Sequence, residues 1–234
     1  MIRAVIFDLD DTLSPEKEYA RSGYHAVADH LCRDFSGRVA GLGGIEAVFD
    51  RLWTLFEESP KMVFNRFLSG LGLPDDRETV MDLVKTYREH RPGIQYYEDV
   101  LPTWKILKEL GLYMGILSDG YGVTQRRKIE ALEAEKYFQP ILLTDEIGRE
   151  AWKPSIIGFR RIAEELGLSL SELVYVGDNP EKDFFISELA PIKTVRILRP
   201  DGVYWNSPYR EGKREQFRIH SLMELKDCGV LELS

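Results

Sequence analysis

Cysteine is scarce in this sequence, which has two among its 234 residues, Cys32 and Cys228. They lie far apart, and neither has a second cysteine at the spacing of a zinc-ligand pair. A disulfide framework or a zinc knuckle is therefore not expected. Free cysteines are typical of a reducing compartment, and we expect a cytoplasmic location.

Long hydrophobic runs and an excess of positive charge are also missing. No apolar stretch approaches the roughly 20 residues that a membrane-spanning helix needs, and no basic and then apolar leader follows Met1. The 31 Lys and Arg residues are outnumbered by 39 Asp and Glu residues, which gives a formal net charge of -8. We therefore expect neither a membrane nor a nucleic acid polymer as a partner.

The sequence does have a core-forming composition and a repeating order of elements. Hydrophobic residues make up 44% of a chain that is long enough for one domain or two modest ones. Short apolar runs alternate with amphipathic helical patterns, which is typical of an α/β protein with a parallel sheet. The predicted strands are residues 2–7, 112–117, 141–144, 173–176 and 194–198, and predicted helices include residues 102–110 and 156–166. The ligand site of such a sheet lies beyond the carboxyl ends of its strands.

Residues 14–92 break this order because they contain no convincing buried strand. Amphipathic patterns predict helices at residues 19–35, 45–57, 62–71 and 77–90. An all-helical insertion directly after the first strand is positioned to act as a lid, with flex points at residues 14–15 and 91–93. Several of its side chains could contact a substrate or pack within the insertion, and none is singled out: Tyr19, Tyr24, His25, Trp53 and Arg66. Residues 199–212 are predicted to form a long surface loop before a final short strand and helix.

Three carboxylates, Asp8, Asp10 and Asp11, follow the first apolar run. On a continuing strand Asp8 and Asp10 would point to the same side, whereas Asp11 would point away and is interpreted as a turn or surface residue. One carboxylate of such a pair can attack phosphate while its neighbour transfers a proton, and Mg²⁺ offsets the repulsion between the anions. A calcium loop is excluded by spacing, since Leu13 and Tyr19 stand where it needs Gly and Glu.

Two later strand ends also carry polar residues. The run ending at Leu117 is followed by Ser118-Asp119-Gly120, where a hydroxyl and main-chain N–H groups could bind a phosphate oxygen, although such a tripeptide is more often an ordinary turn. Gly177-Asp178-Asn179 follows the run at residues 173–176. Asp178 is a natural Mg²⁺ ligand there, with Asp183 as a second, more distant partner.

Lys153 precedes Pro154 at a predicted helix start. A lysine in that place can neutralise charge on a phosphoryl group, although most lysines are simply solvated.

The ordered set of Asp8-x-Asp10-x-Thr12, Ser118, Lys153-Pro154 and Gly177-Asp178 with Asp183 resembles the haloacid dehalogenase (HAD) superfamily of phosphohydrolases. The resemblance implies a Rossmann-like three-layer α/β core, residues 1–13 and 93–234, with a mainly parallel sheet and an inserted all-helical cap of the C1 type, residues 14–92. It implies Asp8 as nucleophile, Asp10 as general acid and base, and Ser118, Asp119 and Lys153 as phosphate-binding residues. Mg²⁺ would be held by Asp8, Asp178 and the Asp10 carbonyl. The supporting residues would be Thr12, Gly120, Gly177, Asn179 and Asp183.

The segment from Ser118 to Glu130 is also similar to that of N-acylneuraminate 9-phosphate phosphatases and related pyrimidine 5′-nucleotidases, which have Thr-Asn-Gly where this chain has Ser118-Asp119-Gly120. The hydroxyl is kept, but Asp119 replaces an amide. The resemblance therefore implies a phosphatase acting on a small phosphorylated metabolite, a sugar phosphate or a nucleotide, as a monomer or homodimer. A phosphomutase and a non-catalytic phosphate-binding protein on the same fold are the alternatives.

Overall fold

The computed structural model describes residues 1–231, and the chain divides into two compact units. The core unit comprises Met1–Lys17 and Ile94–Ser234, and the helical unit comprises Glu18–Gly93. Among the residues described, none of the helices combines the length and the apolar character that crossing a bilayer requires.

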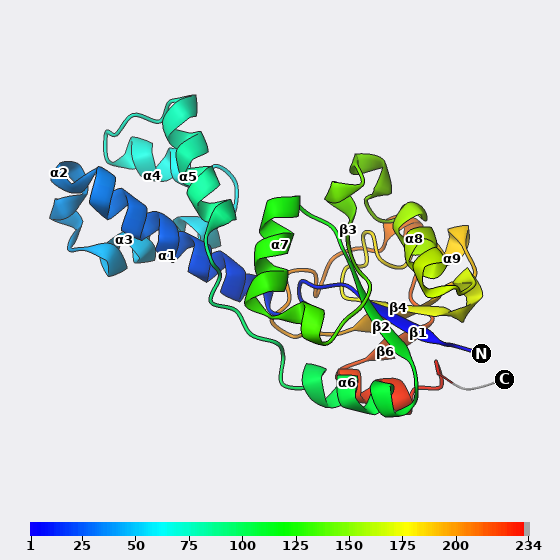
Figure 1. Ribbon diagram of the computed structural model, residues 1–234. Helices are drawn as coiled ribbons and strands as arrows, with labels where there is room; N and C mark the ends of the chain where they lie inside the picture. Colours follow the sequence, from blue (N-terminus) through cyan, green and yellow to red (C-terminus); the bar gives the residue numbers. More distant parts are fainter. Residues whose placement is uncertain (232–234) are drawn as a thin grey trace. The chain divides into compact units, whose positions relative to one another are not determined.

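The core unit contains a six-stranded, all-parallel sheet in the order β3-β2-β1-β4-β5-β6 (Figure 1). Its strands are β1 (Ala4–Phe7), β2 (Tyr113–Ser118), β3 (Ile141–Leu143), β4 (Leu173–Gly177), β5 (Lys193–Ile197) and β6 (Phe217–Ile219). The predicted α/β fold with a parallel sheet is confirmed, and every predicted strand is present within two residues of its expected ends. Strands of this kind are easy to find because both of their faces are buried, which makes them short continuous apolar runs.

Helices cover both faces of the sheet. They are α6 (Val100–Glu109), α7 (Gly122–Ala131), α8 (Ile157–Leu166) and α9 (Ile186–Leu189), with the 3-10 helices η2 (Ala134–Lys136), η3 (Thr144–Glu146), η4 (Arg149–Ala151), η5 (Leu170–Glu172), η6 (Arg210–Gly212) and η7 (Leu222–Lys226). Residues of α8 and α9 pack with Ala4 and Ile6 in one hydrophobic cluster, and α6 lies beside the other face (Figure 1). The predicted final helix is the short 3-10 helix η7.

The helical unit has its own apolar core. Its elements are α1 (Glu16–Asp34, whose first two residues belong to the core unit), α2 (Ser36–Val39), η1 (Ala40–Leu42), α3 (Ile45–Glu58), α4 (Val63–Gly70) and α5 (Arg77–Glu89). Leu31, Leu52 and Phe67 are fully buried at its centre. Because amphipathic helices bury one stripe each, this packing explains the apolar spacing that the sequence displays.

Candidate active site

Three strand ends bring polar side chains to one edge of the sheet. Strand β1 lies between β2 and β4 and pairs with both in parallel. Asp8 follows the last residue of β1, Ser118 ends β2, and Asp178 follows the last residue of β4. Because β1 is the point where the strand order reverses direction, a crevice for a ligand is expected beyond its carboxyl end.

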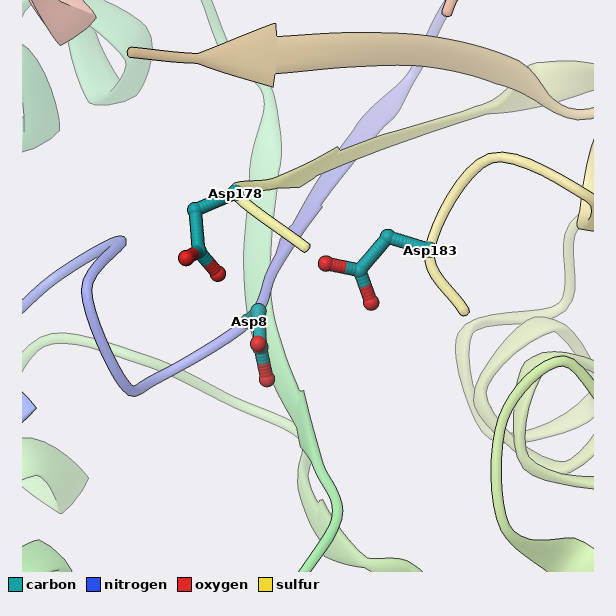
Figure 2. Close-up of side chains that lie close together, drawn as sticks. All are labelled: Asp8, Asp178 and Asp183. Atoms are coloured by element: carbon teal, nitrogen blue, oxygen red, sulfur yellow. The ribbon is translucent and has the colours of Figure 1, made fainter. Parts of the chain in front are cut away.

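Asp8, Asp178 and Asp183 form a compact acidic cluster in this place. One carboxylate oxygen from each lies within 4.8 Å of the others, and all three residues are at least 94% buried, with exposures of 5%, 6% and 1%. Figure 2 shows the three side chains around a common space, with Asp8 beyond β1, Asp178 beyond β4 and Asp183 in the loop that follows. Such a concentration of buried negative charge requires positive compensation.

Lys153 supplies part of that compensation. Its ammonium nitrogen lies 2.8 Å from Asp8 Oδ1 and 2.9 Å from Asp183 Oδ1, and it donates a hydrogen bond to the Tyr175 hydroxyl at 2.6 Å. Burial alone would lower the pKa of Lys153, but the Asp183 and Asp8 carboxylates outweigh it and raise the pKa well above its usual value. Lys153 is therefore a fixed positive charge at the centre of the cluster.

The carboxylates of Asp178 and Asp183, the other two members of the cluster, have different contacts. Asp183 Oδ1 contacts Lys153, and its Oδ2 accepts a hydrogen bond from the main-chain N–H of Asn179 at 2.9 Å. No donor contacts the Asp178 carboxylate among residues 1–231, and burial raises its pKa well above the usual range, with the Asp183 and Asp8 charges adding to the effect. Asp178 is thus the carboxylate left available for an added ligand.

The cluster fits a divalent cation. Three buried carboxylates face one buried lysine, so the cluster with all three carboxylates ionised has a formal excess of two negative charges. Desolvation raises the pKa of Asp8 to about 6, although Lys153 lowers it. A hard cation with oxygen ligands would remove this cost, and Mg²⁺ is suited to one or two carboxylates together with a substrate phosphate.

The Asp10 carboxylate is not part of this cluster, and β1 does not continue through Asp10 as expected. The strand ends at Phe7, and the chain then turns, with the N–H groups of Leu13 and Ser14 both donating to the Leu9 carbonyl. The Asp10 carboxylate is bound by two side chains of α7: Lys128 Nζ lies 2.5 Å from Oδ1, and Gln125 Nε2 lies 2.8 Å from Oδ2. The turn, rather than strand alternation, therefore sets the direction of this side chain.

Asp11 is in a turn, which is one of the two alternatives predicted for it, but it is not on the surface. It is 2% exposed and has a left-handed backbone, with φ of 49°. Its carboxylate accepts hydrogen bonds from the main-chain N–H of Glu16 at 2.9 Å and of Val203 at 2.7 Å. Strand alternation could not predict this, because the chain has already left the strand at Asp11.

The long loop after β5 is fastened to the turn that follows Asp8. Arg199 donates to both carboxylate oxygens of Asp99 and to the Thr12 carbonyl, each at 2.9 Å, and its guanidinium lies 3.9 Å from the centroid of the Tyr97 ring. Residues 200–212 are exposed or half-buried, as predicted for a surface loop, but the first residue, Arg199, is 9% exposed. Arg199 and Val203 therefore connect this loop to the turn at Asp11 and Thr12.

The phosphate-binding candidates occupy the end of β2. The Ser118 hydroxyl is 1% exposed and accepts a hydrogen bond from Gln125 at 2.6 Å. The Asp119 carboxylate accepts from the Thr144 hydroxyl at 2.8 Å and from the main-chain N–H of Lys153 at 3.1 Å. Asp119 therefore connects the end of β2 to the segment that carries Lys153. Gly120 has φ of 125°, a backbone that favours glycine.

Three supporting candidates have different surroundings. A Cβ added to Gly177 would lie 2.4 Å from Asp183 Oδ2, so only glycine fits there without displacing that carboxylate. Asn179 accepts from the main-chain N–H of Glu181 at 2.9 Å through its side-chain oxygen, which shapes the loop. The Thr12 hydroxyl is buried and has no hydrogen-bond partner within the described part of the chain.

Sequence reasoning missed three polar residues near Asp10, of which Gln125 and Lys128 are buried and Glu16 is half-buried. Lys128 and Gln125 contact its carboxylate, and Glu16 is the third: desolvation raises the pKa of Glu16 to about 7, and the Asp10 charge adds to the shift. The pair on α7 lies in the segment that resembles the N-acylneuraminate 9-phosphate phosphatases, and its spacing of three residues places both side chains on one helix face. That spacing does not say what the face contacts.

The residues of the helical unit that were considered for substrate contact are engaged in its own packing. Tyr24 is 5% exposed and lies among aromatic rings that include Trp53. His25 stacks on Phe49 with 3.8 Å between ring centroids, and Arg66 donates to the Leu55 and Ser59 carbonyls. Tyr19 donates to the Tyr87 carbonyl at 3.1 Å.

Comparison with known proteins agrees with this geometry. A family model described as haloacid dehalogenase-like hydrolase matches residues 5–197. The chain belongs to this family. Within it, the glyceraldehyde 3-phosphate phosphatase of Methanopyrus kandleri is 30% identical, with 100% of this chain and 99% of the relative covered. The phosphoserine phosphatase of Thermus thermophilus is 26% identical, with 94% and 100% covered.

Solved structures of HAD proteins share the fold. The HAD-hydrolase YfnB of Bacillus subtilis superposes with a TM-score of 0.64 at 18% identity, covering 96% of each chain. A HAD phosphatase from Thermococcus onnurineus does so with a TM-score of 0.59 at 23% identity, again covering 96% of each chain. The resemblance seen in the sequence motifs therefore extends to the HAD architecture.

Proposed function

We propose that the protein is a Mg²⁺-dependent phosphomonoesterase that hydrolyses a small phosphorylated metabolite through an aspartyl-phosphate formed on Asp8. The family is one of hydrolases, and the relatives above are named phosphatases. The observation that carries the proposal is the buried cluster of Asp8, Asp178 and Asp183 around Lys153. Its excess negative charge suits a divalent cation, and Asp8 follows β1, which lies between β2 and β4.

In this proposal Asp8, Asp178 and the Asp10 carbonyl hold Mg²⁺, which would offset the repulsion between a carboxylate nucleophile and a phosphate dianion. Asp183 stays a supporting residue, because its two oxygens already contact Lys153 and the Asn179 N–H. Lys153 holds Asp8 Oδ1, which leaves Oδ2 as the attacking atom.

The reaction then has two steps. In the first, Asp8 Oδ2 forms a bond to phosphorus, the bond from phosphorus to the ester oxygen breaks, and Asp10 gives a proton to the departing alkoxide. In the second, Asp10 takes a proton from water as the water oxygen bonds to phosphorus. The bond from phosphorus to Asp8 breaks, and inorganic phosphate is released. Ser118 and Lys153 would stabilise charge on the phosphoryl oxygens in both steps.

The relatives' names suggest which substrates should be tested first. Glyceraldehyde 3-phosphate phosphatase is the name of relatives from both Methanopyrus kandleri and Methanocaldococcus jannaschii. We propose a small phosphate monoester of this class as the substrate, with glyceraldehyde 3-phosphate as the first to test. We also propose that the helical unit, which is inserted after the Asp8 turn, contributes to substrate selection.

The test is phosphate release by the purified protein from glyceraldehyde 3-phosphate, phosphoserine, a hexose 1-phosphate and 4-nitrophenyl phosphate, with Mg²⁺ and with EDTA. We expect turnover only with Mg²⁺, and a loss of at least about 1,000-fold in kcat for Asp8→Asn. Triose phosphates lose phosphate spontaneously, so an enzyme-free blank sets the baseline. Full activity of Asp8→Asn would refute the proposal, and transfer of phosphate within the hexose without release would indicate a mutase.

A further inference from the structure

Helix α7 directs two buried polar side chains at the same carboxylate. Lys128 is 3% exposed and Gln125 is 2% exposed. Lys128 Nζ lies 2.5 Å from Asp10 Oδ1, and Gln125 Nε2 donates to Oδ2 at 2.8 Å. Each oxygen of Asp10 therefore has its own donor, and both donors come from one turn of one helix.

Fold stability does not explain this arrangement. Burying a lysine is costly even when it is paired, and replacing a buried ion pair by apolar residues is often neutral or stabilising. An apolar residue at position 128 would therefore serve α7 equally well as packing. The position of Asp10 gives a better reason, because its carboxylate lies beyond the end of β1 and its side chain is 21% exposed. Without the two donors, packing alone would leave its orientation loosely defined.

Gln125 also ties Asp10 to the phosphate-binding end of β2. The same Nε2 donates to the Ser118 hydroxyl at 2.6 Å. A Cβ added to Gly120 would lie 3.3 Å from Gln125 Cδ, so glycine at this turn leaves room for the amide. Gln125 thus fixes the Asp10 carboxylate, which is proposed to transfer protons, relative to the Ser118 hydroxyl, which is expected to bind phosphate.

We propose that Lys128 and Gln125 are positioning residues that hold Asp10 for its role as the base that activates water against the aspartyl-phosphate. This inference rests on the proposed phosphatase function. In the step concerned, the water oxygen bonds to phosphorus and the bond to Asp8 breaks, with its electron pair returning to the Asp8 carboxylate. The water proton goes to Asp10. An Asp10 carboxylate that has lost one donor rotates away from the line of attack, which slows this step.

The test separates the two steps with 4-nitrophenyl phosphate in rapid-mixing experiments with Mg²⁺. Its nitrophenolate leaves without needing a proton, so the first step does not depend on Asp10. For Lys128→Met we expect a burst of nitrophenolate close to one equivalent of enzyme at an unchanged burst rate. The steady-state rate after the burst should fall about 10- to 100-fold. Phosphorylated enzyme should accumulate, as measured by trapping it in acid.

Lys128→Gln keeps an N–H donor but removes the charge, so its steady-state rate should lie between those of the wild type and Lys128→Met. This second variant keeps the proposal testable if the Lys128→Met protein does not fold. The matched control is Lys136→Met, an exposed lysine paired with Glu133, which should leave both rates unchanged. Equal falls in burst and steady-state rates, or no change in either, would overturn the positioning role. A wild-type protein without turnover would instead refute the proposed function.

Discussion

The Lys153 ammonium lies 2.8 Å from Asp8, and it is the nearest positive charge to the carboxylate expected to act as nucleophile. We predict that Lys153→Met, which leaves Asp8 and Asp183 without this partner, destabilises the metal-free protein by about 3–5 kcal/mol. Mg²⁺ should recover part of the loss, because a bound cation compensates the same carboxylates. Urea unfolding with EDTA and with Mg²⁺ measures both effects. The control is Lys136→Met, which should change stability by less than about 0.5 kcal/mol. If Lys153→Met lost the same stability with and without Mg²⁺, that result would contradict the assignment of the metal site.

Glu16 provides a test by pH. Burial and the Asp10 charge raise its pKa to about 7, above the usual 4.5. The folded protein therefore binds more protons at Glu16 than the unfolded chain does between these two values, so this group makes stability fall as pH rises through that window. We predict that Glu16→Gln is more stable than the wild type at pH above about 7, by about 1–3 kcal/mol, and that the difference shrinks toward a pH of about 5. The check is to measure urea unfolding midpoints of both proteins at a series of pH values in EDTA. A stability difference between Glu16→Gln and the wild type that grows as the pH falls would show that the pKa of Glu16 is lowered rather than raised.

Asp11 should be important for the loop after β5. Removing its carboxylate in Asp11→Ala leaves the N–H groups of Glu16 and Val203 without their acceptor, and because both hydrogen bonds are only partly buried the expected cost is about 1 kcal/mol. It also places alanine at a left-handed backbone position. We expect faster proteolytic cleavage within residues 199–209, monitored by mass spectrometry. Asp11→Asn, which tolerates this backbone and keeps one acceptor, should be milder. Asp201→Ala is the control from the same loop, and equal cleavage of the two alanine variants would argue against the anchoring.

Gly177 tests the position of Asp183. A methyl group at this site meets Asp183 Oδ2 at 2.4 Å, so Gly177→Ala must displace the carboxylate that holds Lys153 and the Asn179 N–H. We predict a fall in kcat of about 10-fold or more and a weaker response to Mg²⁺, measured in a Mg²⁺ titration of activity. Gly37→Ala, where an added Cβ meets nothing within 4 Å, should behave like the wild type. A Gly177→Ala enzyme with normal Mg²⁺ dependence would mean that Asp183 is not needed at the metal site.

Much of the fold could be predicted from the sequence because its elements have local causes. Strand β2 is a continuous apolar run, and α8 ends at Gly167, which adopts the left-handed conformation that stops helices. The strand-end positions of Asp8, Ser118 and Asp178 followed from the parallel sheet alone. These features depend on patterns within a few residues or on a general rule of topology.

The rest of the site depends on contacts between segments far apart in the sequence. Lys128 and Asp10 are separated by 118 positions, and helix α7 has a weak apolar pattern, so nothing local indicated that its polar face is buried. The burial of Asp11 was not predicted for a related reason: strand alternation was extended past Phe7, where the chain had already turned. The acceptor role of Asp11 toward Val203 is visible only once the loop is in place.

The central position of β1 also affects the order in which the chain can fold during synthesis. Ala4–Phe7 is made first among the strands, but it pairs with β2, which begins at Tyr113, and with β4, which begins at Leu173. The helical unit is contiguous in sequence and complete at Gly93, so it can fold while β1 still has no strand to pair with. The strand that leads to Asp8 thus gains its second neighbour only once Leu173–Gly177 has been made, and the acidic cluster cannot form before Asp183 has been added.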